Sequence, residues 1–257
     1  MLTLLSPAKS LDFSPAPEGL RTTAPPLADD TAVLMKRCKK LTVPALRELM
    51  SLSQPLGELN RRRFQEMSLP LTPDNAKPCL LAFTGDVYKK LDAASLSRRD
   101  LNWAQNRLRI LSGFYGLLRP LDLIQPYRLE MGVQLDSSRG KDLYEFWGES
   151  LADALNAEHA QRRHSAVLNL ASNEYFKAVA AGRLELPVVT AVFQDIRDGR
   201  PKTIAFLAKK ARGLMARFVI ENRIDEPEGL KDFAAEGYGF RGDLSSDDRL
   251  VFVRQAA

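Results

Sequence analysis

Apolar runs of strand length alternate with amphipathic stretches along most of the chain. A run without polar alternation is typical of a strand that is buried on both faces of a sheet. The runs cover residues 2–5, 79–83, 107–111, 167–170, 188–193, 203–207, 238–240 and 250–253. Helical spacing is found at residues 31–40, 46–50, 101–105, 143–157, from 172 onward, and at 208–222. This interleaving predicts a mixed α/β (α+β) fold.

The first amphipathic stretch predicts a basic helix followed by a second, short helix. Leu34 and Cys38 lie four residues apart on its apolar face, with basic residues between them. Thr42 is a suitable N-cap for the next helix, whose first turn tolerates Pro44. This helix-hairpin-helix-like unit, near residues 31–51, can direct free backbone N–H groups toward a DNA phosphate. Its turn lacks glycine, which would let the backbone approach phosphate, so ordinary helix packing is the alternative interpretation.

Two hairpins are predicted in the last third of the chain. Asp198-Gly199 lies between two apolar runs and is a strong hairpin signal. The second of these runs leads directly into the basic helix at residues 208–222. The last two runs predict another hairpin, at an edge of the sheet.

The composition predicts one soluble domain over residues 1–257. The chain shows neither an internal repeat nor a linker, and 257 residues can bury roughly three quarters of their unfolded surface. We find no signal peptide and no stretch that could span a membrane. Cys38 and Cys79, the two cysteines, fit a reducing cytoplasm, and His159 and His164 lack the spacing of a metal site. We therefore expect a cytoplasmic protein that does not bind a membrane, a metal or a cofactor.

The charge is distributed unevenly, although the net charge of +5 is modest. Residues 31–65 carry eight basic and two acidic residues, and residues 201–217 carry five basic residues and no acid. Residues 221–250 carry nine acidic and four basic residues. This separation predicts a basic face and an acidic face, and a basic face is the electrostatic signature of a nucleic-acid partner.

An irregular stretch at residues 109–147 combines glycine, proline, aromatic and basic residues without regular periodicity. It is either a packed crossover or the wall of a site. Polar residues also follow the run at 79–83, and the end of a buried strand often lines a cleft. The candidate cleft-lining residues from these two segments are Asp86, Tyr88, Tyr115, Tyr127 and Glu130. Lys9, just after the first strand, can reach the same cleft or remain a solvated loop residue.

Six long segments carry a family resemblance. They are LSPAKSLDF, AFTGDVY, LRILSGFYGLLRPLDLIQPYRLEMG, RGKDLYEFWG, LNLASNEYF and AKKARGLMARFVIENR. These segments extend from residue 5 to residue 223 and are similar to the signature segments of the peroxide stress resistance protein YaaA family. The resemblance covers essentially the whole chain.

The resemblance implies a bacterial cytoplasmic protein that protects against peroxide. Members keep reactive intracellular iron low, limit oxidative DNA damage and have the properties of a DNA-binding protein. The implied fold has an open, barrel-like sheet flanked by helices, a helix-hairpin-helix unit and a positively charged cleft. The implied DNA- or phosphate-binding residues are Lys9, Arg119, Arg128, Lys141, Lys209, Lys210 and Arg212. No catalytic residue and no cofactor come with the resemblance.

Two classes of function remain open from the sequence. In the first, the protein binds duplex or branched DNA, mainly through phosphates. In the second, the cleft is an enzyme site for a nucleotide or a nucleic acid, because it offers acids, bases and phosphate-binding cations. The groups that motivate this second reading are Lys9, Asp86, Tyr115, Arg119, Tyr127, Glu130 and Lys141. An indirect effect on iron, through regulation or a protein partner, is compatible with either class.

Overall fold

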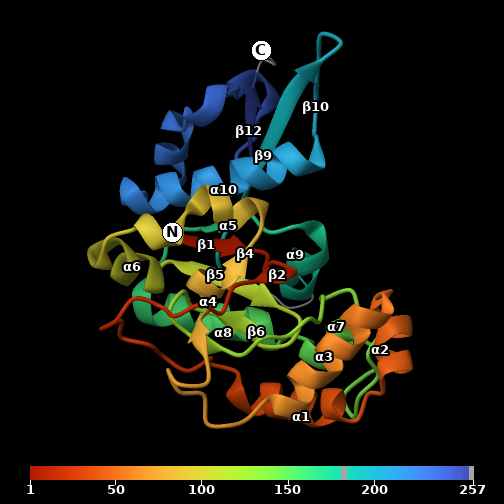
Figure 1. Cartoon of the computed structure of the whole chain (residues 1–257). Helices are drawn as coiled ribbons and strands as arrows, with labels where there is room; N and C mark the ends of the chain where they lie inside the picture. Colours follow the sequence, from red (N-terminus) through yellow and green to blue (C-terminus); the bar gives the residue numbers. More distant parts are fainter. Residues whose placement is uncertain (181–183, 255–257) are drawn as a thin grey trace.

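The computed structural model describes residues 1–180 and 184–254, and its core is one large, mostly parallel sheet (Figure 1). Its strands are β1 (Leu2–Leu5), β5 (Leu108–Ser112), β6 (Gly116–Leu118), β8 (Val167–Asn169), β9 (Val188–Arg197), β10 (Arg200–Lys202), β11 (Tyr238–Phe240) and β12 (Arg249–Arg254). They follow the order β11-β12-β9-β8-β1-β5-β6, with β10 paired to β9. Thr3 in β1 lies beside both Leu108 and Leu168, in parallel register. The first strand of the chain is therefore in the middle of the sheet.

The mixed α/β fold with helices around the sheet confirms the prediction. The strands β5, β1, β8, β9 and β12 run parallel, and Leu2, Leu4 and Leu5 of β1 are fully buried. Burial on both faces is what a continuous apolar run predicts. β6 and β11 end the order and do not pair with each other, so the described part of the sheet is open and is not a closed barrel.

Ten α-helices surround the sheet in the described part of the chain, together with short strands at its margin. The helices are α1 (Ala28–Lys39), α2 (Val43–Met50), α3 (Gln54–Glu66), α4 (Cys79–Ala82), α5 (Asp86–Leu91), α6 (Arg98–Gln105), α7 (Leu143–Trp147), α8 (Ser150–Arg162), α9 (Asn173–Ala180) and α10 (Ala205–Glu221). The short strands are β2 (Ser10–Leu11), β3 (Lys77–Pro78), β4 (Phe83–Thr84) and β7 (Leu123–Ile124). No helix among the described residues has the length and hydropathy needed to cross a membrane.

Helix α10 packs directly against α5, beside the sheet (Figure 1). Gly213 permits this contact, because a Cβ atom at this position would lie 2.0 Å from the carbonyl oxygen of Val87. The two backbones therefore touch, and a larger residue would separate the helices. The contact fixes where the side chains of α10 lie relative to the loop that precedes α5.

Three predicted elements differ from the structure. The run at residues 79–83 is wrong as a strand: Cys79–Ala82 form the short helix α4, and the segment pairs only through β4. A short apolar run fits a buried helical turn as well as a strand, because it has no period to separate them. The run at 203–207 is also wrong as a strand. The second strand of the hairpin, β10, ends at Lys202, and α10 begins at Ala205. Gly148, with φ of 48°, divides the single helix predicted at 143–157 into α7 and α8.

The two helices predicted near residues 31–51 are confirmed as α1 and α2. The hydroxyl of Thr42 caps α2 by accepting a hydrogen bond from the N–H of Ala45 at 3.4 Å. The packing differs from a simple helix pair, because α1 and α2 both pack mainly against α3. Gly57 of α3 allows the closest approach, since a Cβ there would lie 2.6 Å from Cγ of Arg47. The unit is therefore a three-helix arrangement.

His164, just before β8, predicts a pH-dependent stability. Its side chain is buried, and Nε2 has no hydrogen-bond partner among the described residues. Burial, with the positive charges of the N-terminal amine and Arg107, lowers the pKa of His164 to about 4, from an ordinary value of 6.5. The folded protein therefore binds this proton less readily than the unfolded chain. Its contribution to stability is complete above about pH 6.5 and is lost as the pH falls toward 4.

We expect the free energy of unfolding to fall by about 2 kcal/mol between pH 7.5 and pH 5 through this residue. Urea denaturation at both pH values measures the change. The variant His164→Gln, which cannot titrate, is expected to lack this part of the slope. Equal slopes for the two proteins would show that His164 does not control the dependence.

Candidate functional site

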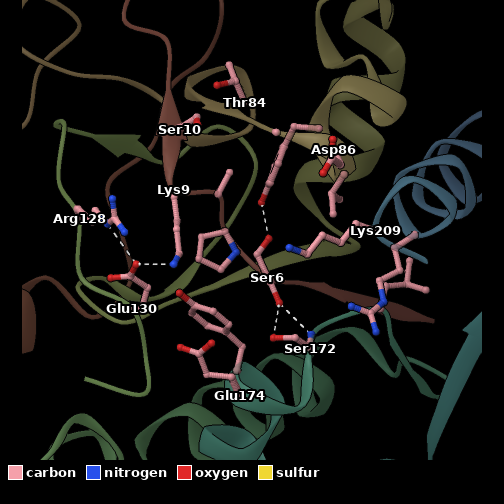
Figure 2. A pocket seen from close by; sticks show the side chains of 18 of the residues that line it. Ser6, Lys9, Ser10, Thr84, Asp86, Arg128, Glu130, Ser172, Glu174 and Lys209 are labelled. Atoms are coloured by element: carbon pink, nitrogen blue, oxygen red, sulfur yellow. Dashed lines mark hydrogen bonds and ion pairs between the residues drawn. The ribbon is translucent and has the colours of Figure 1, made fainter. Parts of the chain in front are cut away.

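A pocket of about 300 Å³ opens at the carboxyl ends of β1 and β8 (Figure 2). The loops that follow these two strands form its floor, and residues from the β4–α5 junction, residues 127–130, α9 and α10 form its walls. In open α/β sheets, ligands bind at the carboxyl ends of the parallel strands. Eight of the predicted residues line this pocket: Lys9, Asp86, Tyr88, Tyr127, Arg128, Glu130, Lys209 and Arg212.

Glu130 connects two cations at one end of the pocket (Figure 2). Its Oε1 lies 3.1 Å from Nζ of Lys9 and 3.1 Å from Nε of Arg128. The Lys9 side chain is 67% exposed, whereas those of Glu130 and Arg128 are 16% and 18% exposed. The other oxygen of Glu130, Oε2, is buried and has no hydrogen-bond partner among the described residues. The carboxylate therefore holds both cations and retains an unused acceptor.

Two serines join the floor loops at the centre of the pocket (Figure 2). The N–H of Ser172 donates to Oγ of Ser6 at 2.8 Å, and the two hydroxyl oxygens lie 3.3 Å apart. The hydroxyl of Tyr88 donates to the carbonyl oxygen of Ser6 at 2.8 Å. Burial raises the pKa of Tyr88 well above its usual value, so this hydroxyl stays protonated. The floor of the pocket is thereby fixed by hydrogen bonds from two separate elements.

Glu174 and Tyr175, in the first turn of α9, form another wall. Oε1 of Glu174 accepts a hydrogen bond from the N–H of Gly132 at 3.0 Å, which ties the loop after Glu130 to α9. Burial, with the nearby charge of Glu174, raises the pKa of Tyr175. This wall presents a carboxylate and a neutral phenol.

Lys209 and Arg212 of α10 form the wall opposite Glu130. They are three residues apart, so they lie on one face of the helix. Neither side chain makes an ion pair or a hydrogen bond with any other residue in the described ranges. Burial lowers the pKa of Arg212, but a guanidinium remains charged at physiological pH. This wall therefore carries two positive charges without a carboxylate partner.

A second hollow of about 830 Å³ adjoins the pocket and is more open to solvent. It shares Lys9, Glu130 and Glu174 with the pocket and lies between α2 and residues 132–136. The pocket and the hollow thus form one groove. This groove, defined by the residues that line the two hollows, runs from α10 to α2.

Arg119 and Lys141, two of the predicted phosphate-binding residues, do not line the pocket. Arg119 pairs with the buried carboxylate of Asp122 at 3.0 Å and donates to the carbonyl oxygen of Ala24. Lys141 pairs with Glu145, four residues along the chain, at 3.1 Å. Both cations are held by nearby acceptors.

Lys210 and Tyr115 also lie away from the pocket lining. The ammonium group of Lys210 lies 4.2 Å from the centre of the Phe206 ring, a cation–π contact with its neighbour on α10. Tyr115 is 1% exposed, and its hydroxyl accepts a hydrogen bond from the N–H of Gln125 at 2.9 Å. Tyr115 is therefore part of the core, where it contacts Phe114 and Tyr127 edge to face.

Sequence reasoning missed six polar residues of the pocket: Ser6, Ser10, Thr84, Ser172, Glu174 and Tyr175. Each lies within a segment that carried the family resemblance, and Ser6 directly follows a predicted strand. The signal that could have found them is the parallel pairing of β1 with β8, which brings the ends of the two strands together. Within the described ranges, no group of three or more His, Cys, Asp and Glu side chains is placed to hold a metal ion.

The fold and the groove define an α/β protein with a charged pocket at the carboxyl edge of an open parallel sheet. The chain matches the family model of the peroxide stress protein YaaA over residues 1–244, and it belongs to that family. It is 54% identical over 258 residues to UPF0246 proteins of Burkholderia mallei, Burkholderia pseudomallei and Burkholderia thailandensis. Each alignment covers 100% of this chain and 99% of the relative. The family resemblance read from the six segments is confirmed, and it supports a role in oxidative stress.

Glu130 predicts a measurable contribution to stability. In Glu130→Gln, Arg128 would lose its carboxylate while the positive charge of Arg63, which is close enough to interact with it, remains. We expect the free energy of unfolding to fall by about 1 to 3 kcal/mol, because removing one partner leaves a largely buried charge unpaired. Denaturant titration measures this difference.

The matched control is Glu228→Gln, which removes a carboxylate that is 80% exposed and pairs with Lys231. An exposed pair of this kind contributes about 0 to 1 kcal/mol. A loss in Glu130→Gln no larger than in the control would mean that Glu130 does not hold the cations of the pocket.

Proposed function

We propose that the protein binds DNA in the response to peroxide stress and that the groove receives the DNA backbone. The observation that carries this proposal is the continuity of the pocket with the open hollow along α2. The groove has unpaired cations at its α10 end, and the helix unit at its other end carries most of the positive charge of residues 31–65. The lining of the groove itself mixes five cations with five carboxylates, so in this proposal the exposed cations of the helix unit supply most of the attraction for a chain of phosphates.

Side chains, rather than backbone amides, carry the affinity in this proposal. Helix α2 has few free amides at its start, since Pro44 has no N–H and the N–H of Ala45 is bonded to Thr42. The helix unit instead offers Lys36, Lys40 and Arg62, which are exposed and have no ion-pair partner among the described residues. Contacts from such side chains go to phosphates and read little sequence. The proposed partner is therefore duplex or branched DNA, bound mainly through phosphates.

The proposal extends to reactive iron and to location. We propose that the protein acts in the cytoplasm and limits DNA damage directly and reactive iron indirectly. Two histidines and two cysteines are few ligands for iron storage, so an indirect route through regulation or a protein partner suits this chain better.

Phosphate contacts predict a steep dependence of DNA affinity on salt. A variant with Lys36→Gln, Lys40→Gln and Arg62→Gln removes three exposed cations. We expect the slope of log K against log salt concentration to become shallower by about 2 to 3, because each lost phosphate contact removes close to one released counterion. Fluorescence anisotropy with a blunt duplex, between low and physiological salt, measures both slopes.

The matched control removes three cations that already have carboxylate partners, with Lys202→Gln, Lys231→Gln and Arg241→Gln. Its salt slope is expected to stay close to that of the unmodified protein. Affinity of the unmodified protein that hardly changes with salt would refute binding through phosphates.

One observation favours a second candidate function, an enzyme that acts on a nucleotide or nucleic acid. The pocket places Asp86, Glu130 and Glu174 among its four cations. Three carboxylates repel phosphate and weaken simple DNA binding, whereas acids and bases beside cations are the groups that chemistry on a phosphorylated substrate requires. Lys9 is the most exposed member of this end of the pocket and can reach a bound substrate.

Lys9→Ala tests the second candidate. A panel of nucleotides and DNA substrates is incubated with the unmodified protein, and product is followed by chromatography. For any substrate that is turned over, we expect Lys9→Ala to lower the rate by about a hundredfold, the size of a typical general acid–base contribution. Lys202→Gln serves as the charge control. Turnover that is unaffected by Lys9→Ala would exclude Lys9 from the chemistry.

A further inference from the structure

Arg212 is unusual among the shielded arginines of this protein. Its side chain is half-buried, yet it makes neither an ion pair nor a hydrogen bond with a residue that the structure describes. Most other shielded arginines hold carboxylates: Arg107 pairs with Asp225, Arg109 with Glu158, Arg217 with Glu221, Arg223 with Asp100, and Arg254 with Asp195. Arg61 and Arg63, which lack a carboxylate, still donate to neutral oxygens, so Arg212 is the shielded arginine that the described part of the fold leaves without any acceptor.

Keeping such a group costs free energy. A guanidinium carries five N–H donors, and shielding them from water without acceptors is unfavourable. The shielding is strong enough to lower the pKa of Arg212. Unsatisfied charge at a pocket wall is therefore explained most simply by an anion that binds there, since a phosphate accepts two parallel hydrogen bonds from one guanidinium.

Lys209 adds a second positive charge on the same face of α10. Its side chain is exposed, has no partner in the described part of the chain, and extends toward Ser6 at the centre of the pocket (Figure 2). The hydroxyls of Ser6 and Ser172 meet on that side. An anion between α10 and the floor would therefore meet two cations and hydroxyl groups.

We propose that Lys209 and Arg212 form a subsite for a phosphate monoester, the terminal phosphate of a single nucleotide that occupies the rest of the pocket. This inference rests on the proposed function, because it names what the pocket end of the DNA-binding groove takes up. A phosphate monoester carries a charge of about −1.5 to −2 at neutral pH and matches two uncompensated cations, whereas an internal phosphodiester carries only one charge. The pocket volume of about 300 Å³ lies at the lower end of small-ligand pockets and suits one nucleotide.

Asp86 provides an internal check on this subsite. Its carboxylate lines the same pocket and makes no ion pair with Lys209, Arg212 or any other described residue. It is a like charge for an incoming phosphate and opposes binding. Replacing Asp86 and replacing Arg212 should therefore change the affinity in opposite directions, which a general loss of structure cannot do.

The test measures binding of thymidine 5′-monophosphate by isothermal titration calorimetry, with thymidine as the ligand that lacks phosphate. Two oligonucleotides of identical sequence, with and without a 5′-phosphate, form a second arm that separates a free nucleotide from a strand end. We expect saturable binding that requires the phosphate in at least one arm. Arg212→Gln and Lys209→Gln should each weaken it at least about tenfold, the size of one charge-assisted contact.

The variants are compared with Lys202→Gln, which removes a lysine that pairs with Asp198 in the β9–β10 turn and should leave the affinity unchanged. Asp86→Asn should strengthen binding by about threefold or more. If Arg212→Gln does not fold, Lys209→Gln and Asp86→Asn decide the question, since one removes an exposed side chain and the other removes only a charge. Equal affinity for thymidine and its monophosphate, or unchanged affinity in Lys209→Gln and Arg212→Gln, would overturn the subsite.

The salt titration with a blunt, unphosphorylated duplex is run on the same preparations. Loss of phosphate-dependent nucleotide binding with intact, salt-dependent duplex binding would refute the subsite and leave the DNA proposal standing. Phosphate-dependent nucleotide binding without duplex binding would refute the DNA proposal and leave the subsite standing. Binding only in the oligonucleotide arm would overturn the assignment to a single nucleotide and, if Arg212→Gln weakens it, would identify a phosphorylated strand end as the ligand.

Discussion

The parallel pairing of β1 with both β5 and β8 is the constraint on which the site depends. It brings the first residues of the chain between segments that begin at residues 108 and 167, and all three strands end at the same edge of the sheet. Ser6 and Lys9 follow one strand and Ser172 follows another, so the floor of the pocket exists only when this pairing is complete. Contacts between such distant segments form at a high cost in loop entropy, and the buried leucines of β1 offset that cost.

Charge compensation divides the pocket into two ends with different properties. At one end Glu130 pairs with both Lys9 and Arg128 and Glu174 lines the same part of the pocket, so two carboxylates offset the two cations before any ligand arrives. At the other end Lys209 and Arg212 have no such carboxylate. The charge of the pocket is therefore asymmetric, neutral at one end and positive at the other. Such a pocket would orient a ligand that carries a negative charge at one end only.

The sequence predicted much of the fold because the strands of the sheet are apolar on both faces, and continuous apolar runs mark that environment. It failed at residues 79–83, where a run of five residues has no period to separate a helical turn from a strand. For Arg119 and Lys141, the sequence itself indicates that the charge is paired locally, because Asp122 and Glu145 lie three and four residues away and neutralise them. Lys209 and Arg212 have no acid at those spacings. Ser6 and Ser172 could not be found from spacing, because 166 residues separate the two partners of their hydrogen bond.

The width of the pocket between α10 and α5 depends on one residue, Gly213. The backbone of α10 rests on Val87, one residue beyond Asp86, so the distance between two walls is set by the absence of a side chain. Because the two backbones are already in contact, α10 and α5 cannot approach each other any further. A relative with alanine or serine at this position would hold its two cations farther from the wall formed by α5, and would accept a larger anion or bind the same one more loosely.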